Sequence, residues 1–509
     1  MTIHCLRASY RSRILAIVAL SGLLASFLGA LAQGSRPVAA RPARPANSAP
    51  AESSNTPALL ISDIHFDPFH DPARVQELVA APVSQWRSIL SSPTSANQQQ
   101  AFAALQQSCH ARGVDTPFAL FDSALQAMRA RQPDARFMMV SGDLIAHGFD
   151  CRYAAVLPGS KPGDYQAFVL KTLSFVMGEL RASFPGMPVY MALGNNDTGC
   201  GDYQLDPGSD YLAQAGRIFA EGLPLSERQQ ALREFEKGGY YSVAMAEPMR
   251  GARLIVVNDL YFSPHYSTCG GQPDPAAGAA EMSWLERQLA EARRSGQRVW
   301  VMGHIPPGID PYSTAAKFRD ICGGQAPVRF LSSDKMADLL VEYADVVRLG
   351  IFAHTHMDEM RLLAPEGSQP PGASQERVAI KIVPSISPVD GNNPSFTVAR
   401  VNPSSASLDD YEVIAADNQT GINAHWTAEY DYARGYHEAR FSSSAVKELM
   451  GEFRADRDAK TEASKVYLRG YFVGDRSMEL SPFWAQYVCA LDNYTVRKYR
   501  ECVCSAARE

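Results

Sequence analysis

Residues 58 to 65, Ala58-Leu-Leu-Ile-Ser-Asp-Ile-His65, decide how the rest of the chain is interpreted. An apolar run ends there in Asp63 and His65. Residues two apart along an extended strand point to the same side. A carboxylate and an imidazole therefore leave the end of one predicted strand together, which is typical of the beginning of a metal site.

Four later stretches repeat this arrangement of an apolar run followed by a polar side chain. The predicted strands at 137–140, 189–193, 299–302 and 346–352 lead to Asp143, Asn195, His304 and the pair His354 and His356. Predicted helices at 118–132, 165–182 and 281–294 alternate with these strands, which indicates an α/β fold with a largely parallel sheet. Because sites in open α/β sheets form at the carboxyl ends of strands, we expect these side chains to converge.

The predicted group contains four imidazoles, two carboxylates and one amide oxygen. Imidazole with oxygen and no sulfur suits zinc, iron or manganese. One metal needs about four ligands, so seven groups with one bridging carboxylate match two four-coordinate ions. A single Gly-Asp or His-x-His is more often structural, but five such sites in series favour a metal centre. The candidate ligands are Asp63, His65, Asp143, Asn195, His304, His354 and His356.

These motifs resemble the calcineurin-like metallophosphoesterase superfamily, and within it the acid sphingomyelinase-like phosphodiesterases and the related endopolyphosphatases. The resemblance covers about residues 58–435 and is loose in the C-terminal part. The motifs that carry it, besides the seven ligands, are His147, Gly303-His304-Ile-Pro-Pro-Gly308, Ser385-Ile-Ser-Pro388, Asn392-Asn-Pro394 and 426–430.

The resemblance implies a four-layer sandwich of two facing mixed β-sheets flanked by helices, with two divalent metals. The metals are usually zinc in exported members, with iron or manganese as alternatives. One metal would take Asp63, His65, Asp143 and His356. The other would take Asp143, Asn195, His304 and His354, so that Asp143 bridges. A water or hydroxide held between the two cations would attack phosphorus in line, without a protein nucleophile.

Three further residues have implied roles near the metals. We expect His147 to bind phosphate or donate a proton to the leaving oxygen, the alternative being a loop histidine. Asn196 stands where family members often have histidine, and an amide can position phosphate but cannot act as an acid. This favours an acidic leaving group, such as a nucleotide or polyphosphate, over a ceramide alkoxide. We expect Asp197 to orient His147 or Asn196 from outside the ligand set.

The N-terminus predicts export. Residues 1–13 carry three arginines and no acid, residues 14–28 are almost wholly apolar, and an Ala-Leu-Ala sequence ends at Ala32. We interpret residues 1–32 as a signal peptide, the alternative being a retained membrane anchor, and the Ala- and Pro-rich residues 33–57 as a disordered linker. The expected localisation is secreted or periplasmic, with no stable membrane span after cleavage.

Composition limits the class of partner. The chain has 509 residues, 46% of them hydrophobic and 20% charged, which is ordinary for a globular protein. Loss of the three N-terminal arginines changes the formal net charge from −6 to −9. An acidic protein is a poor candidate for nucleic-acid binding. The expected partner is a small phosphorylated substrate: nucleotide-like, polyphosphate or a phospholipid head group.

Eight cysteines remain after the signal peptide, and an even number in an exported chain favours disulfides. We expect Cys269 to pair with Cys322, Cys489 to pair with Cys502 or Cys504, and one pair to form among Cys109, Cys151 and Cys200.

The expected domains are a phosphoesterase domain at 58–402 and a mainly helical, cysteine-containing lobe at 403–509. Substrate specificity would lie in the lobe and in the loops at 201–216 and 264–280. The leading hypothesis is an exported two-metal phosphodiesterase. The alternatives are a polyphosphatase or phosphomonoesterase on the same metals, a non-catalytic binding protein that kept the fold, and a tethered adhesion protein.

Overall fold

The computed structural model describes residues 55–365, 376–474 and 477–506. The predicted signal peptide and most of the predicted linker lie outside these residues. The described chain belongs to one compact unit that begins at Ser53. Within the described residues, no helix combines the length and the apolar character that a membrane crossing requires.

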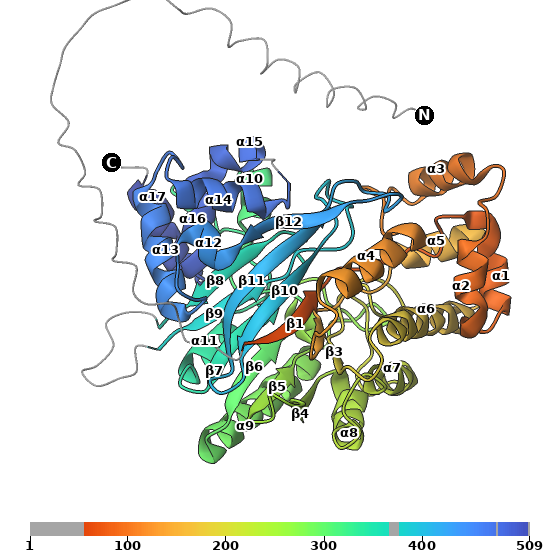
Figure 1. The fold of residues 1–509 in the computed structure, drawn as a ribbon, viewed down its shortest axis with the longest axis horizontal. Helices are drawn as coiled ribbons and strands as arrows, with labels where there is room; N and C mark the ends of the chain where they lie inside the picture. The colour runs from red at the N-terminus through yellow and green to blue at the C-terminus, as the bar shows by residue number, and fades with distance from the viewer. Residues whose placement is uncertain (1–54, 366–375, 475–476, 507–509) are drawn as a thin grey trace, which may run out of the picture. The chain divides into compact units, whose positions relative to one another are not determined.

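The first sheet is built around β1, the strand that leads to Asp63 and His65. β1 pairs in parallel with β2, and β2 with β3, whereas β10, β11 and β12 are antiparallel to their neighbours. Figure 1 shows the long strands β10 to β12 beside β1. In spatial order the strands are β12 (Trp426–Asp431), β11 (Ser407–Ala416), β10 (Ser395–Asn402), β1 (Thr56–Ile61), β2 (Met138–Val140) and β3 (Val189–Met191).

The second sheet has a parallel centre and an antiparallel strand at each edge. In spatial order its strands are β4 (Tyr241–Ala244), β5 (Ala252–Val256), β6 (Arg298–Met302), β7 (Val347–Phe352), β9 (Val378–Ile382) and β8 (Glu359–Leu363). The predicted largely parallel sheet is therefore two mixed sheets.

The two sheets face each other across the main core. In β5, Leu254 and Val256 pack in the apolar cluster that contains the first sheet, whereas Ile255, and Val257 just after the strand, pack in the cluster that contains the helix at Pro275–Ser295. This alternation is the period of two expected for a strand buried on both faces. Trp300 of β6 also donates a 2.7 Å hydrogen bond to the carbonyl of Ala406 beyond β10. The predicted α/β fold of two facing mixed sheets flanked by helices is thus confirmed.

The helices complete the outer layers. The first part of the chain provides α1 (Val75–Ala80), α2 (Trp86–Ser91), α3 (Gln98–Ser108), α4 (Phe118–Arg131), α5 (Phe149–Val156), α6 (Pro162–Ser183), α7 (Asp210–Ala220) and α8 (Arg228–Gly238). The middle provides α9 (Pro275–Ser295), α10 (Pro311–Ala316) and α11 (Lys335–Glu342), and the C-terminal part provides α12 (Tyr432–Tyr436), α13 (Ser443–Ala455), α14 (Glu462–Tyr471), α15 (Ser477–Leu480), α16 (Trp484–Asp492) and α17 (Val496–Ala506).

The C-terminal segment differs from the expected helical lobe at its beginning. β11 and β12 lie beyond residue 402 and extend the first sheet, so the helices begin only at Tyr432. Asp431 ends β12 and caps α12, because its side chain accepts a hydrogen bond from the backbone of Arg434.

Four disulfides occur in the described residues. Two agree with the expectations: Cys489 with Cys502, and Cys109 with Cys151. The predicted bond between Cys269 and Cys322 is wrong. Cys269 pairs with Cys200 and Cys322 pairs with Cys504, because the fold brings the loops of 200 and 269 together and lays α17 against the loop after α10.

Candidate metal centre

The seven candidate ligands lie where strands of both sheets end. β1 leads to Asp63 and His65, and β2 and β3 lead to Asp143 and Asn195. From the second sheet, β6 leads to His304 and β7 leads to His354 and His356. Five of them have positive φ, between 43° and 71°: Asp63, His65, Asp143, His354 and His356. Non-glycine residues in this region are strained, and such strain concentrates at functional sites.

Two glycines next to candidate ligands are required by close packing. A Cβ atom on Gly194 would lie 2.0 Å from the carboxylate of Asp143. A Cβ atom on Gly303 would lie 2.2 Å from the carboxylate of Asp259, which also accepts a 2.7 Å hydrogen bond from the backbone of His304. The Gly-Asn and Gly-His pairs in the sequence therefore allow neighbouring loops to approach closely.

One group of ligands surrounds the His304 ring. Its Nε2 atom lies 3.1 Å from Oδ1 of Asn195 and 3.2 Å from Oδ2 of Asp143. Nδ1 of His354 lies 3.2 Å from the same Nε2 atom. All four side chains that the resemblance assigns to one metal are therefore together.

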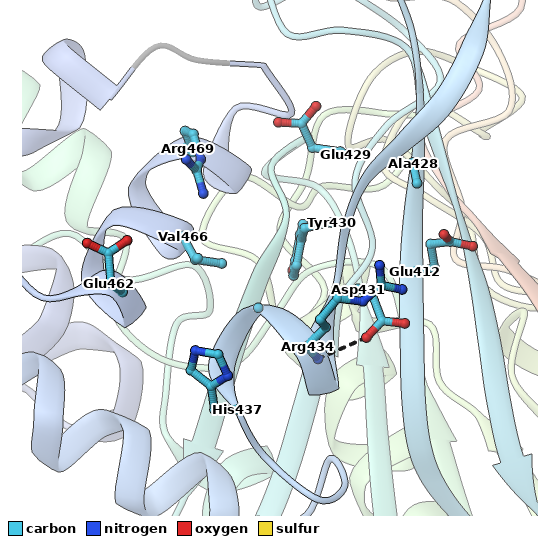
Figure 2. Close-up of a pocket in the computed structure, with 11 residues that line it drawn as sticks. Glu412, Ala428, Glu429, Tyr430, Asp431, Arg434, His437, Glu462, Val466 and Arg469 are labelled. Carbon is cyan, nitrogen blue, oxygen red and sulfur yellow. Dashed lines mark hydrogen bonds between the residues drawn. The ribbon is translucent and has the colours of Figure 1, made fainter. Parts of the chain in front are cut away.

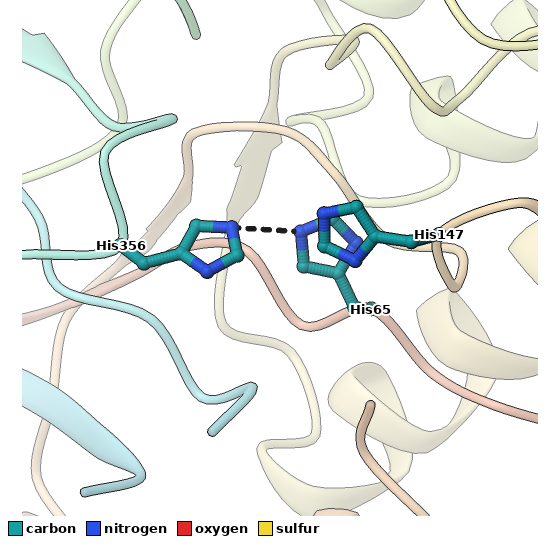
Figure 3. Close-up of side chains that lie close together, drawn as sticks. All are labelled: His65, His147 and His356. Carbon is teal, nitrogen blue, oxygen red and sulfur yellow. Dashed lines mark hydrogen bonds between the residues drawn. The ribbon is translucent and has the colours of Figure 1, made fainter. Parts of the chain in front are cut away.

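A second group surrounds His65 and His356, whose Nε2 atoms are 3.1 Å apart (Figure 3). Oδ1 of Asp63 lies 3.4 Å from Nε2 of His356. Oδ2 of Asp143 lies 3.5 Å from Nε2 of His65, and it also contacts the first group through His304. Asp143 thus stands between the two groups, where a bridging ligand would have to be.

The hydrogen bonds of these side chains leave lone pairs pointing at one another. The Nδ1 atoms of His65 and His304 donate to the backbone carbonyls of Ile145 and Ser141, at 3.0 and 2.8 Å. With Nδ1 carrying a proton, Nε2 is the atom of each ring that can bind a cation once the ring is neutral. Oδ1 of Asp63 is buried and has no hydrogen-bond partner within the described residues. The ligand atoms of the second group thus face one another at 3.1 to 3.5 Å, an arrangement that a bound cation would stabilise.

The electrostatics of the site also favour cations. Burial alone would lower the pKa of His65 and His304, but the carboxylates beside them raise these pKa values to about 9 and about 10. Burial alone would raise the pKa of Asp143, but the charge of His304 holds it well below its ordinary value. The carboxylates therefore create a negative potential in which a positive charge is stabilised, whether it is a proton or a metal ion.

Carboxylates that the sequence did not reveal support several ligands. Oδ2 of Asp390 lies 3.0 Å from Nδ1 of His356, and Asp202 accepts a 2.8 Å hydrogen bond from the amide of Asn195. Such outer contacts fix the orientation of a ligand. Asp390 and Asp202 follow no apolar run, so spacing gave no signal for them.

His147 lies beside the second group. Its ring stacks on His65 with centroids 3.8 Å apart, as Figure 3 shows. Nδ1 of His147 donates to Asp115 at 2.8 Å, and its backbone N–H donates to the same carboxylate at 3.0 Å. Burial and the charge of His65 lower the pKa of His147 to about 4. The ring is thus held at the site rather than free in a loop, and Asp115 is a contact that the sequence did not predict.

Asn196 and Asp197 support the loops that carry the ligands. Asn196 donates to both oxygens of Asp143, from its backbone at 2.9 Å and from its side chain at 2.8 Å. Asp197 accepts hydrogen bonds from the backbone of Gly194 and of Leu144, at 2.9 and 2.7 Å. Its carboxylate therefore ties the loops after β2 and β3 together, and these loops carry Asp143 and Asn195.

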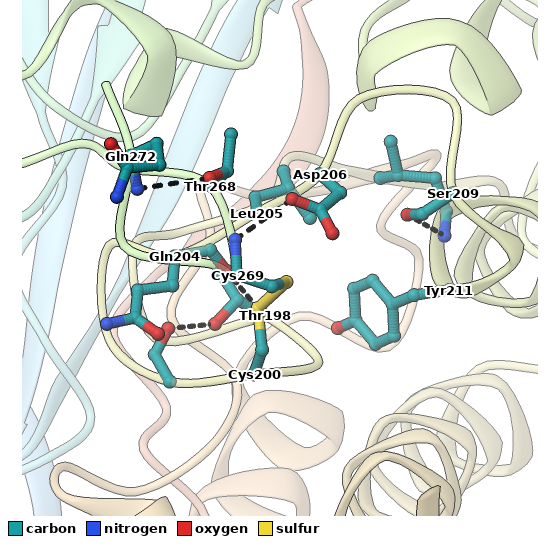
Figure 4. Close-up of a disulfide and its surroundings, with 12 residues drawn as sticks. Thr198, Cys200, Gln204, Leu205, Asp206, Ser209, Tyr211, Thr268, Cys269 and Gln272 are labelled. Carbon is teal, nitrogen blue, oxygen red and sulfur yellow. Dashed lines mark hydrogen bonds between the residues drawn. A yellow bond between two sulfur atoms is a disulfide. The ribbon is translucent and has the colours of Figure 1, made fainter. Parts of the chain in front are cut away.

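A disulfide links two loops, one of which contacts candidate ligands (Figure 4 shows the disulfide). Cys200 and Cys269 join the loops at 198–206 and 263–274. The first loop carries Asp202 and also Tyr203, whose hydroxyl lies 3.4 Å from Nε2 of His354. The two segments in which the sequence analysis placed substrate specificity are thus linked next to the ligands.

A separate surface pocket of about 410 Å³ lies between β12 and helices α12 and α14 (Figure 2). It is lined by charged side chains, among them Arg434, Glu462 and Arg469, with Tyr430. None of its lining residues is a candidate metal ligand.

Comparison with known proteins shows the family of the chain. The sequence profile of the family described as calcineurin-like phosphoesterase matches residues 56–358. The cyclic GMP-AMP phosphodiesterase SMPDL3A of Mus musculus is 25% identical over 405 residues, which cover 76% of this chain and 82% of that protein. The acid sphingomyelinase-like phosphodiesterase 3b of Homo sapiens is 25% identical over 408 residues, 76% of this chain and 80% of that protein.

Among solved structures, a dimetal phosphatase from Danio rerio aligns with 73% of this chain and 98% of its own, at 13% identity and a TM-score of 0.37. The sequence matches confirm the predicted resemblance and the predicted enzyme class, a metal-dependent hydrolase of phosphoric ester bonds. Because the family profile covers more than half of its length, the chain belongs to the calcineurin-like phosphoesterase family.

Proposed function

We propose that the protein is an exported two-metal phosphoesterase that hydrolyses phosphodiester or phosphoanhydride bonds. The observation that carries this proposal is the convergence of imidazole, carboxylate and amide ligands in two groups that share Asp143. One metal would be held by Asp63, His65, Asp143 and His356, and the other by Asp143, Asn195, His304 and His354. Divalent ions, with zinc the first choice for this set of donors, would supply a water of lowered pKa and neutralise phosphoryl charge.

The chain's own residues then have separate tasks. The side chain of His147, held by Asp115, would bind a phosphoryl oxygen and give a proton to the leaving oxygen. The negative charge of a bound substrate would favour the protonated ring that this transfer needs. Asn196 would keep the carboxylate of Asp143 in the bridging orientation, which is a positioning task that an amide can perform without titrating.

The expected substrate has an acidic leaving group. The relatives are named as phosphodiesterases, one of them acting on cyclic GMP-AMP, but at 25% identity these names give only the class of reaction. With one imidazole near the leaving group, a phosphate is easier to expel than an alkoxide. A polyphosphatase or phosphomonoesterase on the same metals is the second candidate, and it shares every residue of the metal centre.

Export is supported by the disulfides and by the sequence of the N-terminus. The four disulfides in the described residues are typical of an oxidising compartment. The signal peptide predicted at residues 1–32 also indicates export. We therefore propose a secreted or periplasmic location.

A substrate panel tests the proposed function. Purified protein, loaded with zinc or manganese, is assayed on bis-p-nitrophenyl phosphate, p-nitrophenyl phosphate, nucleoside triphosphates, polyphosphate and sphingomyelin. We expect hydrolysis of the diester or of the anhydrides with the highest kcat/KM. Sphingomyelin as the best substrate would contradict the argument from the leaving group, and no hydrolysis of any compound would favour a binding protein.

A further inference from the structure

Arg112 is an exposed cation on a loop that is fixed at the rim of the candidate metal centre. The disulfide between Cys109 and Cys151 ties one end of this loop to α5. Gly113 packs directly on the backbone of Val389, because a Cβ atom on Gly113 would lie 2.2 Å from the Val389 carbonyl oxygen. The loop that carries Arg112 is therefore anchored next to Asp390, which supports His356.

The other end of the same loop reaches the catalytic side of the site. Asp115, three residues after Arg112, holds the ring of His147. Arg112 is thus held on a short loop whose neighbouring residues contact Val389, next to Asp390, and His147. The positive charge of Arg112 opposes the rise that burial causes in the pKa of Tyr203, and it adds to the lowering of the pKa of Asp390 by His356. Tyr203 lies 3.4 Å from His354 and Asp390 lies 3.0 Å from His356, so the charge of Arg112 acts on one neighbour of each metal group.

No polar or charged group in the described part of the chain binds Arg112 directly, although its charge acts on Asp390. Within the described residues Arg112 takes part in no hydrogen bond and no ion pair. Arg152, in contrast, is buried and bound to Asp67 and Asp115 at 2.6 and 3.1 Å. A planar guanidinium with five free N–H donors matches the geometry of a phosphate, which it can bind through two parallel hydrogen bonds.

We propose that Arg112 binds the leaving group when that group is itself a phosphate, and so makes the site selective for phosphoanhydrides. This inference rests on the proposed function. In the reaction, the oxygen of water forms a new bond to phosphorus while the bond to the leaving oxygen breaks. The electron pair stays on the leaving phosphate, one proton of the water passes to solvent, and Arg112 holds the anion that departs.

The test compares two substrates that share the attack step but differ in the leaving group. Inorganic tripolyphosphate releases a phosphate anion, whereas bis-p-nitrophenyl phosphate releases p-nitrophenolate. In Arg112→Gln we expect the ratio of kcat/KM for tripolyphosphate to that for the diester to fall about 10- to 100-fold, the effect of losing charged hydrogen bonds. The same ratio for Arg112→Lys, which keeps the charge but not the planar guanidinium, should lie between those of the native protein and Arg112→Gln. Arg250→Gln, which alters an exposed arginine 82% accessible to solvent, should leave the ratio unchanged.

A binding measurement separates this inference from the proposed function. Titration calorimetry with inorganic pyrophosphate should show about tenfold weaker binding to Arg112→Gln than to the native chain. An unchanged ratio of kcat/KM, or native protein that cleaves the diester but not tripolyphosphate, overturns the role of Arg112 and leaves the phosphoesterase intact. If the native protein hydrolyses neither compound, the proposed function fails, and unchanged pyrophosphate binding in Arg112→Gln then overturns the subsite as well.

Discussion

The contact between Asp115 and His147 can be tested by Asp115→Asn, which keeps the shape of the side chain and removes its charge. One carboxylate oxygen accepts from Nδ1 of His147 at 2.8 Å and from the hydroxyl of Ser387 at 3.2 Å. The other accepts from the backbone of His147 at 3.0 Å and from Arg152 at 3.1 Å. An amide has only one accepting oxygen, so at least the hydrogen bond from Nδ1 of His147 is lost in one orientation, and two hydrogen bonds are lost when the amide nitrogen faces Arg152.

The size of the effect follows from those contacts. Two lost hydrogen bonds in a buried charged network should cost about 3 kcal/mol of unfolding free energy. Loosening the ring of His147 should lower kcat about 100-fold, the lower end of the range for general acid catalysis, because p-nitrophenolate needs little help to leave. The assay is steady-state hydrolysis of bis-p-nitrophenyl phosphate, with thermal unfolding measured on the same samples.

A double-mutant cycle decides whether Asp115 acts through His147. If it does, Asp115→Asn should change kcat little once His147→Ala has removed the ring. A full additional loss in the double variant would refute the reasoning. Asp417→Asn is the matched control, because Asp417 lies 3.0 Å from His425 in an exposed pair away from the metal centre. It should leave kcat unchanged.

Three further perturbations have defined outcomes. Asp390→Ala should weaken metal binding about 10- to 100-fold, because His356 loses the carboxylate that orients it. Competition with a chelator measures the affinity for metal, and an unchanged affinity would contradict the role of Asp390. Burial raises the pKa of Glu281 well above its ordinary value of 4.5, so the folded state keeps a proton that the unfolded state releases. The free energy of unfolding should then fall above about pH 4.5, by up to about 1.4 kcal/mol per pH unit, and Glu281→Gln should lessen this fall. Denaturant titrations at several pH values measure it, and parallel pH profiles for the native protein and Glu281→Gln would contradict it. Replacing Cys200 and Cys269 by serine should cost roughly 4 kcal/mol, since the bond closes a loop of 69 residues, and an unchanged melting temperature would show that other contacts hold the loop.

The strand ends could be predicted because their signal is local. An apolar run followed by a ligand occurs within a few residues, as in 58–65, and the rule for strand ends in α/β folds brings such groups together. The mixed character of the sheets was not predictable in the same way. β10 pairs with β1 although Ser395–Asn402 and Thr56–Ile61 lie far apart in the chain, and β11 and β12 continue the sheet from there. Periodicity contains no information about which strands are neighbours.

The supporting carboxylates were missed for a related reason. Asp115 stands just before a helix and Asp390 stands in a loop, and neither position has a pattern that separates it from an ordinary solvated aspartate. Only the folded chain brings Asp115 to His147 and Asp390 to His356. The wrong pairing of Cys269 with Cys322 has the same origin, because sequence spacing does not tell which loops meet.

The central claim is that Asp143 bridges two metals. Metal content per chain, determined by mass spectrometry after loading with zinc and removal of unbound ions, tests it most directly on the native protein and on Asp143→Asn. We predict two ions per native chain and fewer than one per Asp143→Asn chain, with the far-ultraviolet circular dichroism of the fold retained. Two ions per chain in both proteins, or at most one ion in the native protein, would contradict the account.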